Sequence, residues 1–362
     1  MSRLTDVVLQ FDLAGQIESI KPLGNGLIND TYKVETVGGP SYVLQRINHN
    51  IFKDVDLLQN NIVSVTSHIR RKLEAAGASD VDRKVLTFIP LKNSDRTYYF
   101  DGESYWRVSL FIEDAYTYET VDPEYSYYAG RSFGHFEAML ADIPDTLGET
   151  IPDFHNMELR ARQLDEAVAA DSVGRMAEEE ILKEILIHRE EMCKAERMHR
   201  EGVLPKRICH CDTKVNNMMF DASGEVLCVI DLDTVMPGLV GHDFGDAIRF
   251  DGNFVEEDSP EYEKVGVNMD VFRAFTEGFL EKTAGALTQT ELDTLALSSF
   301  VLTVELAVRF LDDYIQGSPY FKINYPEHNL VRTRNQIALA KDMQKKLPLM
   351  EQIVKDCVAV IC

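Results

Sequence analysis

Apolar and polar residues follow one another in the N-terminal third of the chain in short runs that predict an antiparallel sheet. Residues 17–46 are typical of a strand, a glycine-rich turn and a second strand, and Tyr42–Leu44 forms a further strand run after the turn at Gly38–Pro40. Strand-like runs also lie at 84–89, 98–100 and 106–112. One helix is predicted over 56–76, where Leu57, Asn61, Val65 and Ile69 share one line and Gly77 marks the end.

The pattern changes to helical periodicity after residue 112. Asp122-Pro123-Glu124 is a typical helix start, because Asp caps, Pro takes the first helical position and Glu faces the helix dipole. Residues 157–200 predict amphipathic helices, and Thr288–Glu291 predicts another helix start. Short strands interrupt this region around Asp221–Gly224. We therefore predict an α+β fold with a small antiparallel-sheet N-terminal lobe, 1–112, and a larger, mainly helical C-terminal lobe, 113–362.

Composition and charge exclude several classes of protein. The chain of 362 residues carries 37 Lys+Arg and 60 Asp+Glu, and a net charge of −23 disfavours binding to nucleic acid. The first ten residues lack the pattern of a signal peptide, and the most apolar long stretch, 292–315, holds five charged residues, so no membrane span is predicted. The six cysteines form no CxxC pair, which favours reduced thiols and a cytoplasmic protein.

The segment from His210 to Asp233 carries the strongest chemical signal. Asp212 is followed five residues later by Asn217, which matches the H-x-D-x-x-x-x-N catalytic loop of protein-kinase-like enzymes. In such loops the Asp accepts the proton of a hydroxyl and the Asn binds a metal ion. A predicted hairpin then leads to Asp231, nineteen residues beyond Asp212, at the place of a second metal ligand.

Plainer interpretations of these residues stay open. Asp212 and Asn217 could be loop residues that cap backbone groups, and Lys214 could contact phosphate or simply face solvent. Asp243-Phe244-Gly245 spells the D-F-G of protein kinases but lies thirty-one residues past Asp212. We expect Asp243 and Asp246 to support the loop by hydrogen bonds rather than to bind metal.

A glycine-rich turn near the N-terminus offers a nucleotide site. Gly24, Asn25, Gly26 and Asn29 lie between two predicted strands, where backbone N–H groups can approach a triphosphate, although an ordinary hairpin turn would look the same. The following strand contains no Lys. Arg46 is its available cation, and this assignment fails if the strand register turns Gln45 to the site instead.

Together these motifs resemble the aminoglycoside phosphotransferase and choline kinase-like superfamily, small-molecule kinases with a protein-kinase-like bilobal fold. Within it the chain is similar to the N-acetylhexosamine 1-kinases over most of its length. The segments that carry the likeness are GNGLINDTY (24–32), YVLQRIN (42–48), IPDFH (151–155), DTKVNN (212–217), VIDLDTVMPG (229–238) and RFLDDY (309–314).

The resemblance implies a reaction and a set of roles. ATP would donate its γ-phosphate to the anomeric hydroxyl of N-acetylglucosamine or N-acetylgalactosamine, with Asp212 as base. Asn217 and Asp231 would hold Mg²⁺, the N-terminal lobe would bind the nucleotide, and Arg309 and Tyr320 would contact the sugar. The residues alone show that Arg309 lies beside an apolar helical stripe and that Glu305 precedes it by four positions. A surface salt bridge between these two side chains would give the same pattern.

Other interpretations remain at this stage. The acceptor could be homoserine, methylthioribose, choline or an aminoglycoside, and a cationic acceptor would need an acidic or aromatic cage. The missing small-lobe Lys and Glu would also fit a nucleotide-binding pseudokinase. We expect a monomer or weak homodimer whose partners are ATP and a small molecule.

Overall fold

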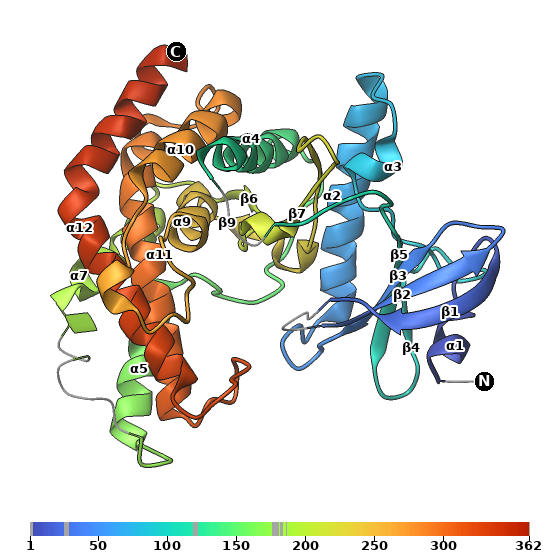
Figure 1. The fold of residues 1–362 in the computed structure, drawn as a ribbon, viewed down its shortest axis with the longest axis horizontal. Helices are drawn as coiled ribbons and strands as arrows, with labels where there is room; N and C mark the ends of the chain where they lie inside the picture. Colours follow the sequence, from blue (N-terminus) through green and yellow to red (C-terminus); the bar gives the residue numbers. More distant parts are fainter. Residues whose placement is uncertain are drawn as a thin grey trace. The chain divides into compact units, whose positions relative to one another are not determined.

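The computed structural model describes residues 3–24, 29–118, 122–175, 181, 184–185 and 187–361 (Figure 1). The chain divides into two compact units, which we describe separately. Unit 1 comprises 1–117, 142–152 and 218–236, and unit 2 comprises 118–141, 153–217 and 237–362. Both units are discontinuous, whereas the predicted lobes, 1–112 and 113–362, are continuous stretches of chain.

Unit 1 is built on a five-stranded antiparallel sheet, as predicted. Its strands lie in the order β1-β2-β3-β5-β4, with bounds β1 Gln16–Pro22, β2 Asp30–Val37, β3 Tyr42–Ile47, β4 Tyr98–Phe100 and β5 Tyr105–Leu110. Helix α1 (Arg3–Val8) packs against the sheet, and together they bury a core that includes Val8, Phe11, Leu44 and Val108. From residue 42 to 45 of β3, buried Tyr42 and Leu44 alternate with half-buried Val43 and Gln45, as the period of two in a strand requires.

Two helices and a second hairpin complete unit 1. Helix α2 (Val55–Ala75) confirms the predicted helix, and Gly77 follows it at φ 71°, which glycine adopts without strain. The strand expected at 84–89 is wrong: the chain forms α3 (Val81–Lys84) and then a single bridge at Phe88. Strands β7 (Met218–Phe220) and β8 (Val226–Val229) form the hairpin that leads to η2 (Leu232–Thr234).

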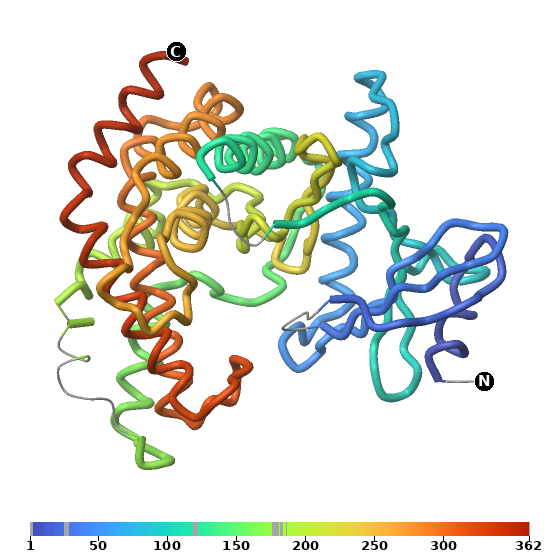
Figure 2. Tube along the Cα trace, in the orientation of Figure 1, coloured from blue at the N-terminus to red at the C-terminus, as the bar shows by residue number. Residues whose placement is uncertain are grey.

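Unit 2 is mainly helical, again as predicted. Among the described residues its helices and strands are α4 Pro123–Leu140, α5 Met157–Ala170, α7 Arg189–Met192, α8 Lys194–Arg200, β6 Arg207–Cys209, η1 Val215–Asn217, β9 Met236–Gly238 (whose first residue is the last of unit 1), α9 Val240–Asp251, η3 Tyr262–Lys264, α10 Met269–Thr283, α11 Gln289–Ile315 and α12 His328–Ile361. Figure 2 traces α12 to the C-terminus in red. Asp122 caps α4, and Thr288 and Glu291 form a capping box on α11, which confirms both predicted starts.

Helix α11 is the central helix of unit 2. It packs against α9, α12 and α5. By length and composition it could cross a membrane, but 89% of its most apolar window is buried inside the protein, as expected for a core helix. Helices α4 and α10 pack very closely elsewhere in this unit, because a Cβ on Gly130 would lie only 2.1 Å from the Phe275 carbonyl oxygen.

Candidate active site

The loop between β6 and η1 presents Asp212 in unit 2. The Asp212 Oδ1 atom lies 2.8 Å from Lys214 Nζ, and Oδ2 accepts a hydrogen bond of 3.0 Å from Asn217 Nδ2. Asn217 Nδ2 also donates to the Asp212 backbone oxygen at 2.8 Å. The two predicted residues are therefore brought together, and a cation that the prediction left undecided completes the group.

The charges in this loop keep Asp212 ionised. Burial raises the pKa of Asp212, but the ammonium charge and hydrogen bond of Lys214 outweigh burial, and the pKa lies below its usual range. Burial lowers the pKa of Lys214, but the charges of Asp212 and Asp246 outweigh burial, and the pKa lies above its usual value. Lys214 therefore keeps its proton. The loop thus presents a carboxylate that can orient a hydroxyl and accept its proton during transfer.

Helix α9 holds this loop in place through its carboxylates. Asp243 accepts backbone hydrogen bonds of 2.6 and 2.7 Å from His210 and Cys211. Asp246 accepts one of 3.1 Å from Thr213, and Asp251 one of 3.3 Å from Val215.

Four backbone N–H groups of a tight loop are satisfied in this way, including that of Cys211, whose φ of 63° is left-handed. The interpretation of Asp243 and Asp246 as supports of the loop is confirmed.

Asp231 lies in unit 1, directly after β8. It has a φ of 57° and is followed by the short helix η2, so the chain turns sharply at this carboxylate. Asn217 and Asp231 both offer hard oxygen atoms, the kind of ligand that Mg²⁺ and Ca²⁺ prefer. The amide nitrogen of Asn217 is already used on Asp212, which leaves Oδ1 as the atom suited to a cation.

A buried ion pair anchors the Asp231 segment within unit 1. Arg107 on β5 forms an ion pair with Asp233, and only 3% and 4% of their side-chain areas are exposed. Arg107 Nε also donates to Gln45 Oε1 at 3.0 Å, while Asn29 Nδ2 donates to Asp233 Oδ2 at 2.7 Å. One network therefore joins β3, β5, the start of β2 and the segment that carries Asp231.

Sequence reasoning missed Arg107. The available signal was one Arg inside the apolar strand run 106–112, which demands a buried partner but does not identify it.

Arg309 and Tyr320 form a cluster of one cation and three aromatic rings in unit 2. The guanidinium carbon of Arg309 lies 4.9 Å from the ring centroid of Phe154, 5.7 Å from that of Tyr320 and 5.5 Å from that of Phe321. Asp313 fixes the loop that carries two of these rings, since its carboxylate accepts hydrogen bonds of 2.8 and 3.1 Å from the backbone N–H groups of Tyr320 and Phe321. The predicted pair of substrate residues is thus brought together.

Carboxylates of α11 face the cations of this cluster. Glu305 is fully buried, binds His155 at 2.9 Å and lies 3.5 Å from Arg309. Burial raises the pKa of Glu305, but the charges of His155 and Arg309 outweigh burial and lower it to about 2. Arg160 adds a second cation near Arg309, and both burial and the charge of Arg309 lower its pKa. Asp312 also faces Arg160 and Arg309, and its buried Oδ1 atom has no hydrogen-bond partner among the described residues, so the cluster contains both cations and carboxylates.

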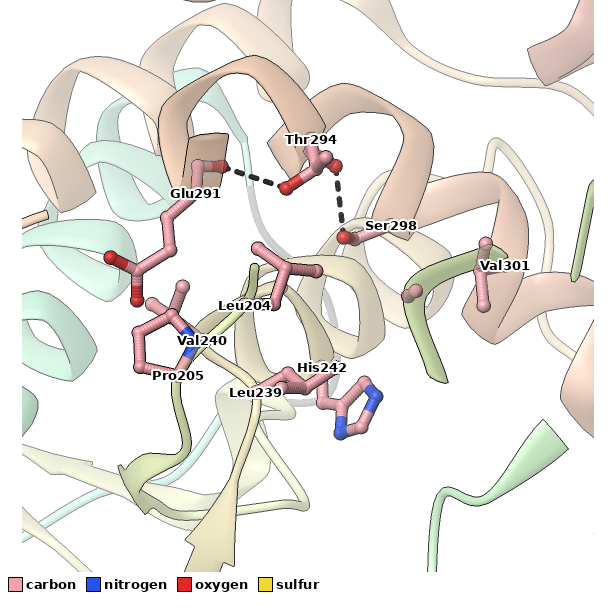
Figure 3. A pocket seen from close by; sticks show the side chains of 11 residues that line it. Leu204, Pro205, Leu239, Val240, His242, Glu291, Thr294, Ser298 and Val301 are labelled. Carbon is pink, nitrogen blue, oxygen red and sulfur yellow. Dashed lines mark hydrogen bonds between the residues drawn. The ribbon is translucent and has the colours of Figure 1, made fainter. Parts of the chain in front are cut away.

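A small cavity beside α9 and α11 is not part of this arrangement (Figure 3). Three of its polar lining groups already have partners: Thr294 and Ser298 donate to carbonyl oxygens of their own helix, and Glu291 binds Arg207. Leu204, Pro205, Leu239 and Val240 supply most of its remaining wall. We assign no ligand to it.

Comparison with known proteins decides the family. A family model described as "Phosphotransferase enzyme family" (APH) matches residues 19–275, well over half of the chain. The chain belongs to this phosphotransferase family.

Solved structures of similar fold include several small-molecule kinases. An aminoglycoside phosphotransferase from Alicyclobacillus acidocaldarius is 14% identical, with a TM-score of 0.64 and coverage of 97% of this chain and 96% of that one. A microcompartment-associated aminopropanol kinase is 16% identical, with a TM-score of 0.64 and coverage of 96% and 98%. An amicoumacin kinase in complex with AMP-PNP, Ca²⁺ and Ami is 14% identical, with a TM-score of 0.56 and coverage of 98% and 92%. These likenesses establish the kinase-like α+β fold.

The structure describes two of the four residues of the glycine-rich turn that are predicted to bind nucleotide. Gly24 has a φ of 68°, which suits a tight turn, while Asn25 and Gly26 lie outside the described residues. Asn29 is used inside unit 1, because its amide binds Asp233 and accepts from the Asn48 backbone N–H at 2.9 Å. A direct contact between Asn29 and nucleotide stays a prediction.

The predicted role of Arg46 loses its support. Residues 45 and 46 face opposite sides of β3, and the register turns Gln45 to the network with Arg107. Arg46 instead forms an ion pair with Asp30, with 43% and 50% of the two side chains exposed. Arg107 is the buried cation of this sheet, and we no longer assign Arg46 to phosphate binding.

Proposed function

We propose that this phosphotransferase moves the γ-phosphate of ATP to a hydroxyl of a neutral small molecule, with the anomeric hydroxyl of an N-acetylhexosamine as the preferred acceptor. Phosphate transfer is supported above all by the Asp212 carboxylate, which Lys214 contacts on one oxygen and Asn217 on the other. Positioning and charge stabilisation supply most of the catalysis in phosphoryl transfer, and this loop provides both.

The roles in the reaction follow from this geometry. Asp212 orients the acceptor hydroxyl and takes its proton as the new bond from oxygen to phosphorus forms and the bond from phosphorus to the ADP oxygen breaks. Lys214 keeps Asp212 ionised and lies where its charge can offset that of the transferring group. The resemblance assigns a divalent cation to the Asn217 amide oxygen and the Asp231 carboxylate, and such a cation would neutralise phosphate charge. The resemblance assigns the glycine-rich turn at Gly24, Asn25 and Gly26 to the nucleotide.

The charge around Arg309 supports a neutral acceptor. The rings of Phe154, Tyr320 and Phe321 already face the Arg309 guanidinium, so they do not offer a free cage to a quaternary ammonium group. The carboxylates of Glu305 and Asp313 are bound to cations or backbone N–H groups. The arginines of this cluster can donate hydrogen bonds to the hydroxyl and amide oxygens of a neutral sugar.

A panel of acceptors tests this proposal. We would measure phosphate transfer from ATP and Mg²⁺ to N-acetylglucosamine, N-acetylgalactosamine, galactose, homoserine, choline and kanamycin, and identify the product by phosphorus NMR. We expect a sugar 1-phosphate and at least tenfold lower kcat/KM for the cationic acceptors. Transfer only to choline or kanamycin would overturn the acceptor class, and tight ATP binding without transfer to any of them would favour a pseudokinase.

A further inference from the structure

His155 connects the loop of Asp212 to the helix of Arg309 within unit 2. Its Nδ1 atom lies 3.0 and 2.9 Å from the two carboxylate oxygens of Glu305, and its Nε2 atom lies 3.2 Å from the backbone oxygen of Cys211. Cys211 directly precedes Asp212. Only 7% of His155 is exposed, so water does not replace these contacts.

The contacts of His155 require a proton on both ring nitrogens. A carboxylate and a carbonyl oxygen are acceptors only, so each nitrogen must donate and the ring is an imidazolium. Burial lowers the pKa of His155, but the charge and hydrogen bond of Glu305 outweigh burial and raise it above its usual value. The neighbouring ring of His242, 4.9 Å away, differs, because burial and the charge of His155 lower its pKa to about 3.

Glu305 also faces the acceptor cluster. Its Oε1 atom lies 3.5 Å from Arg309 Nη1, and Arg309 is the cation packed between Phe154, Tyr320 and Phe321. A continuous series of contacts therefore runs from Arg309 through Glu305 and His155 to the residue before Asp212. A rigid series of this kind fixes the distance between an acceptor held by Arg309 and the base that takes its proton.

We infer that His155 is a positioning residue, which sets the Asp212 loop against the acceptor cluster through the shared carboxylate of Glu305. This inference rests on the proposed function, since it assumes that Asp212 is the base and that Arg309 faces the acceptor. His155 itself touches neither substrate. A buried ion pair that only stabilises the fold would show the same contacts but would not govern turnover.

The test compares His155→Gln, Glu305→Gln and the double variant with the full-length wild type. Gln at 155 carries both N–H donors on one nitrogen and an acceptor oxygen on the other terminal atom, so it cannot replace the two separate ring nitrogens that face Glu305 and Cys211. We expect kcat of His155→Gln to fall about 100-fold, as for a misplaced catalytic group, with KM for ATP within about twofold of wild type. Because both changes break the same series, the double variant should lose no more than about threefold beyond the worse single variant.

His328→Gln is the matched control. His328 is a buried histidine of the same unit that binds Asp258 at 3.0 Å and accepts from the Asn324 backbone N–H, and none of these contacts involves the Asp212 loop or Arg309. We expect its kcat to stay within about twofold of wild type even if its melting temperature falls, as for a residue remote from the reaction. A kcat for folded His155→Gln within about twofold of wild type, or losses that simply multiply in the double variant, would overturn the inference.

The slow transfer of phosphate from ATP to water separates this inference from the proposed acceptor. Water needs Asp212 but is not held by Arg309, so His155→Gln should lower this rate clearly less than it lowers kcat for the acceptor. If the wild type transfers phosphate to a hydroxyl of another small molecule, the proposed sugar is refuted, and the same comparison can be made with that acceptor. A fall in hydrolysis as large as the fall in kcat would show that His155 acts on the Asp212 loop alone and would overturn its role against the acceptor cluster.

Discussion

Each unit of the molecule contains one buried ion pair next to a segment of proposed function, and the two pairs differ in chemistry. In unit 1, Arg107 and Asp233 anchor the segment that carries Asp231. In unit 2, His155 and Glu305 adjoin the loop that carries Asp212. The first cation is permanently charged, whereas the second is a histidine, whose charge depends on pH.

The Asp231 segment and the Asp212 loop are held in place by different kinds of contact. Asp233 has further partners inside unit 1, because its carboxylate accepts from Asn29 and its backbone oxygen accepts from Thr150 at 2.8 Å. That segment is fixed under all ordinary conditions. The Asp212 loop is held by the carboxylates of α9 and, in addition, by an imidazolium whose charge is stabilised mainly by Glu305. We therefore expect the unit 1 pair to govern stability and the unit 2 pair to respond to pH.

The largest expected effect is on the free energy of unfolding. Arg107→Met leaves Asp233 buried without its cation and should destabilise the protein by about 3–5 kcal/mol, as for other broken buried pairs. Denaturant unfolding measures this loss. Arg107→Met combined with Asp233→Leu should recover part of it, and a single variant as stable as wild type would show that the pair is not buried in solution.

The pH dependence of stability should separate the two pairs. The pKa of His155 is raised above 6.5, so its contribution is full below pH 6.5 and is lost as pH rises through the folded pKa. The pKa of Glu305 falls from 4.5 to about 2, so its contribution is full above pH 4.5 and is lost toward pH 2.

The difference in unfolding free energy between wild type and His155→Gln should therefore be larger at about pH 5.5 than at about pH 9. Titration of His155 takes place against Glu305, Arg309, Asp246 and His242, which all face it. The same difference for Arg107→Met should stay flat, because arginine keeps its charge. A flat profile for His155→Gln would show that the ring is neutral in the folded state.

A smaller effect is expected on acceptor affinity. Asp313→Asn weakens the charged hydrogen bonds that fix Tyr320 and Phe321, and each such bond contributes roughly 1.5–3 kcal/mol. We expect KM for the acceptor to rise about tenfold, or about 1.4 kcal/mol, with little change in kcat. Asp293→Asn on the same helix is the matched control, since Asp293 is exposed and accepts a hydrogen bond from the Gln289 side chain. A rise confined to KM for ATP would contradict this assignment of the loop.

The smallest effect is expected at Arg46. Its exposed ion pair with Asp30 should contribute less than about 1 kcal/mol, so Arg46→Gln should leave stability nearly unchanged. KM for ATP should also stay within about twofold, measured by initial rates at saturating acceptor. A tenfold or larger increase would restore the phosphate-binding role that the sequence suggested for Arg46.

The sequence was sufficient for local features and for contacts that follow from spacing. The cap at Asp122, the capping box at Thr288 and the pairing of Asp212 with Asn217 all depend on residues no more than five positions apart. The order and type of the main elements also follow from hydrophobic period.

Contacts across long separations could not be predicted in the same way. His155 and Glu305 are 150 residues apart, and Arg107 and Asp233 are 126 apart. A lone charge in an apolar run shows that a partner exists but not which one. The register of β3 depends on β2 and β5, so the choice between Gln45 and Arg46 needed the sheet itself.

The most direct test of the central claim is the rate of phosphate transfer by Asp212→Asn, compared with Asp95→Asn at an exposed position as control. Loss of the base should lower kcat by about 10²–10⁴-fold, while ADP affinity measured by calorimetry and the melting temperature stay close to wild type. Asp95→Asn should match wild type in all three measurements. If Asp212→Asn keeps its rate, Asp212 is not the base and the proposed mechanism is wrong.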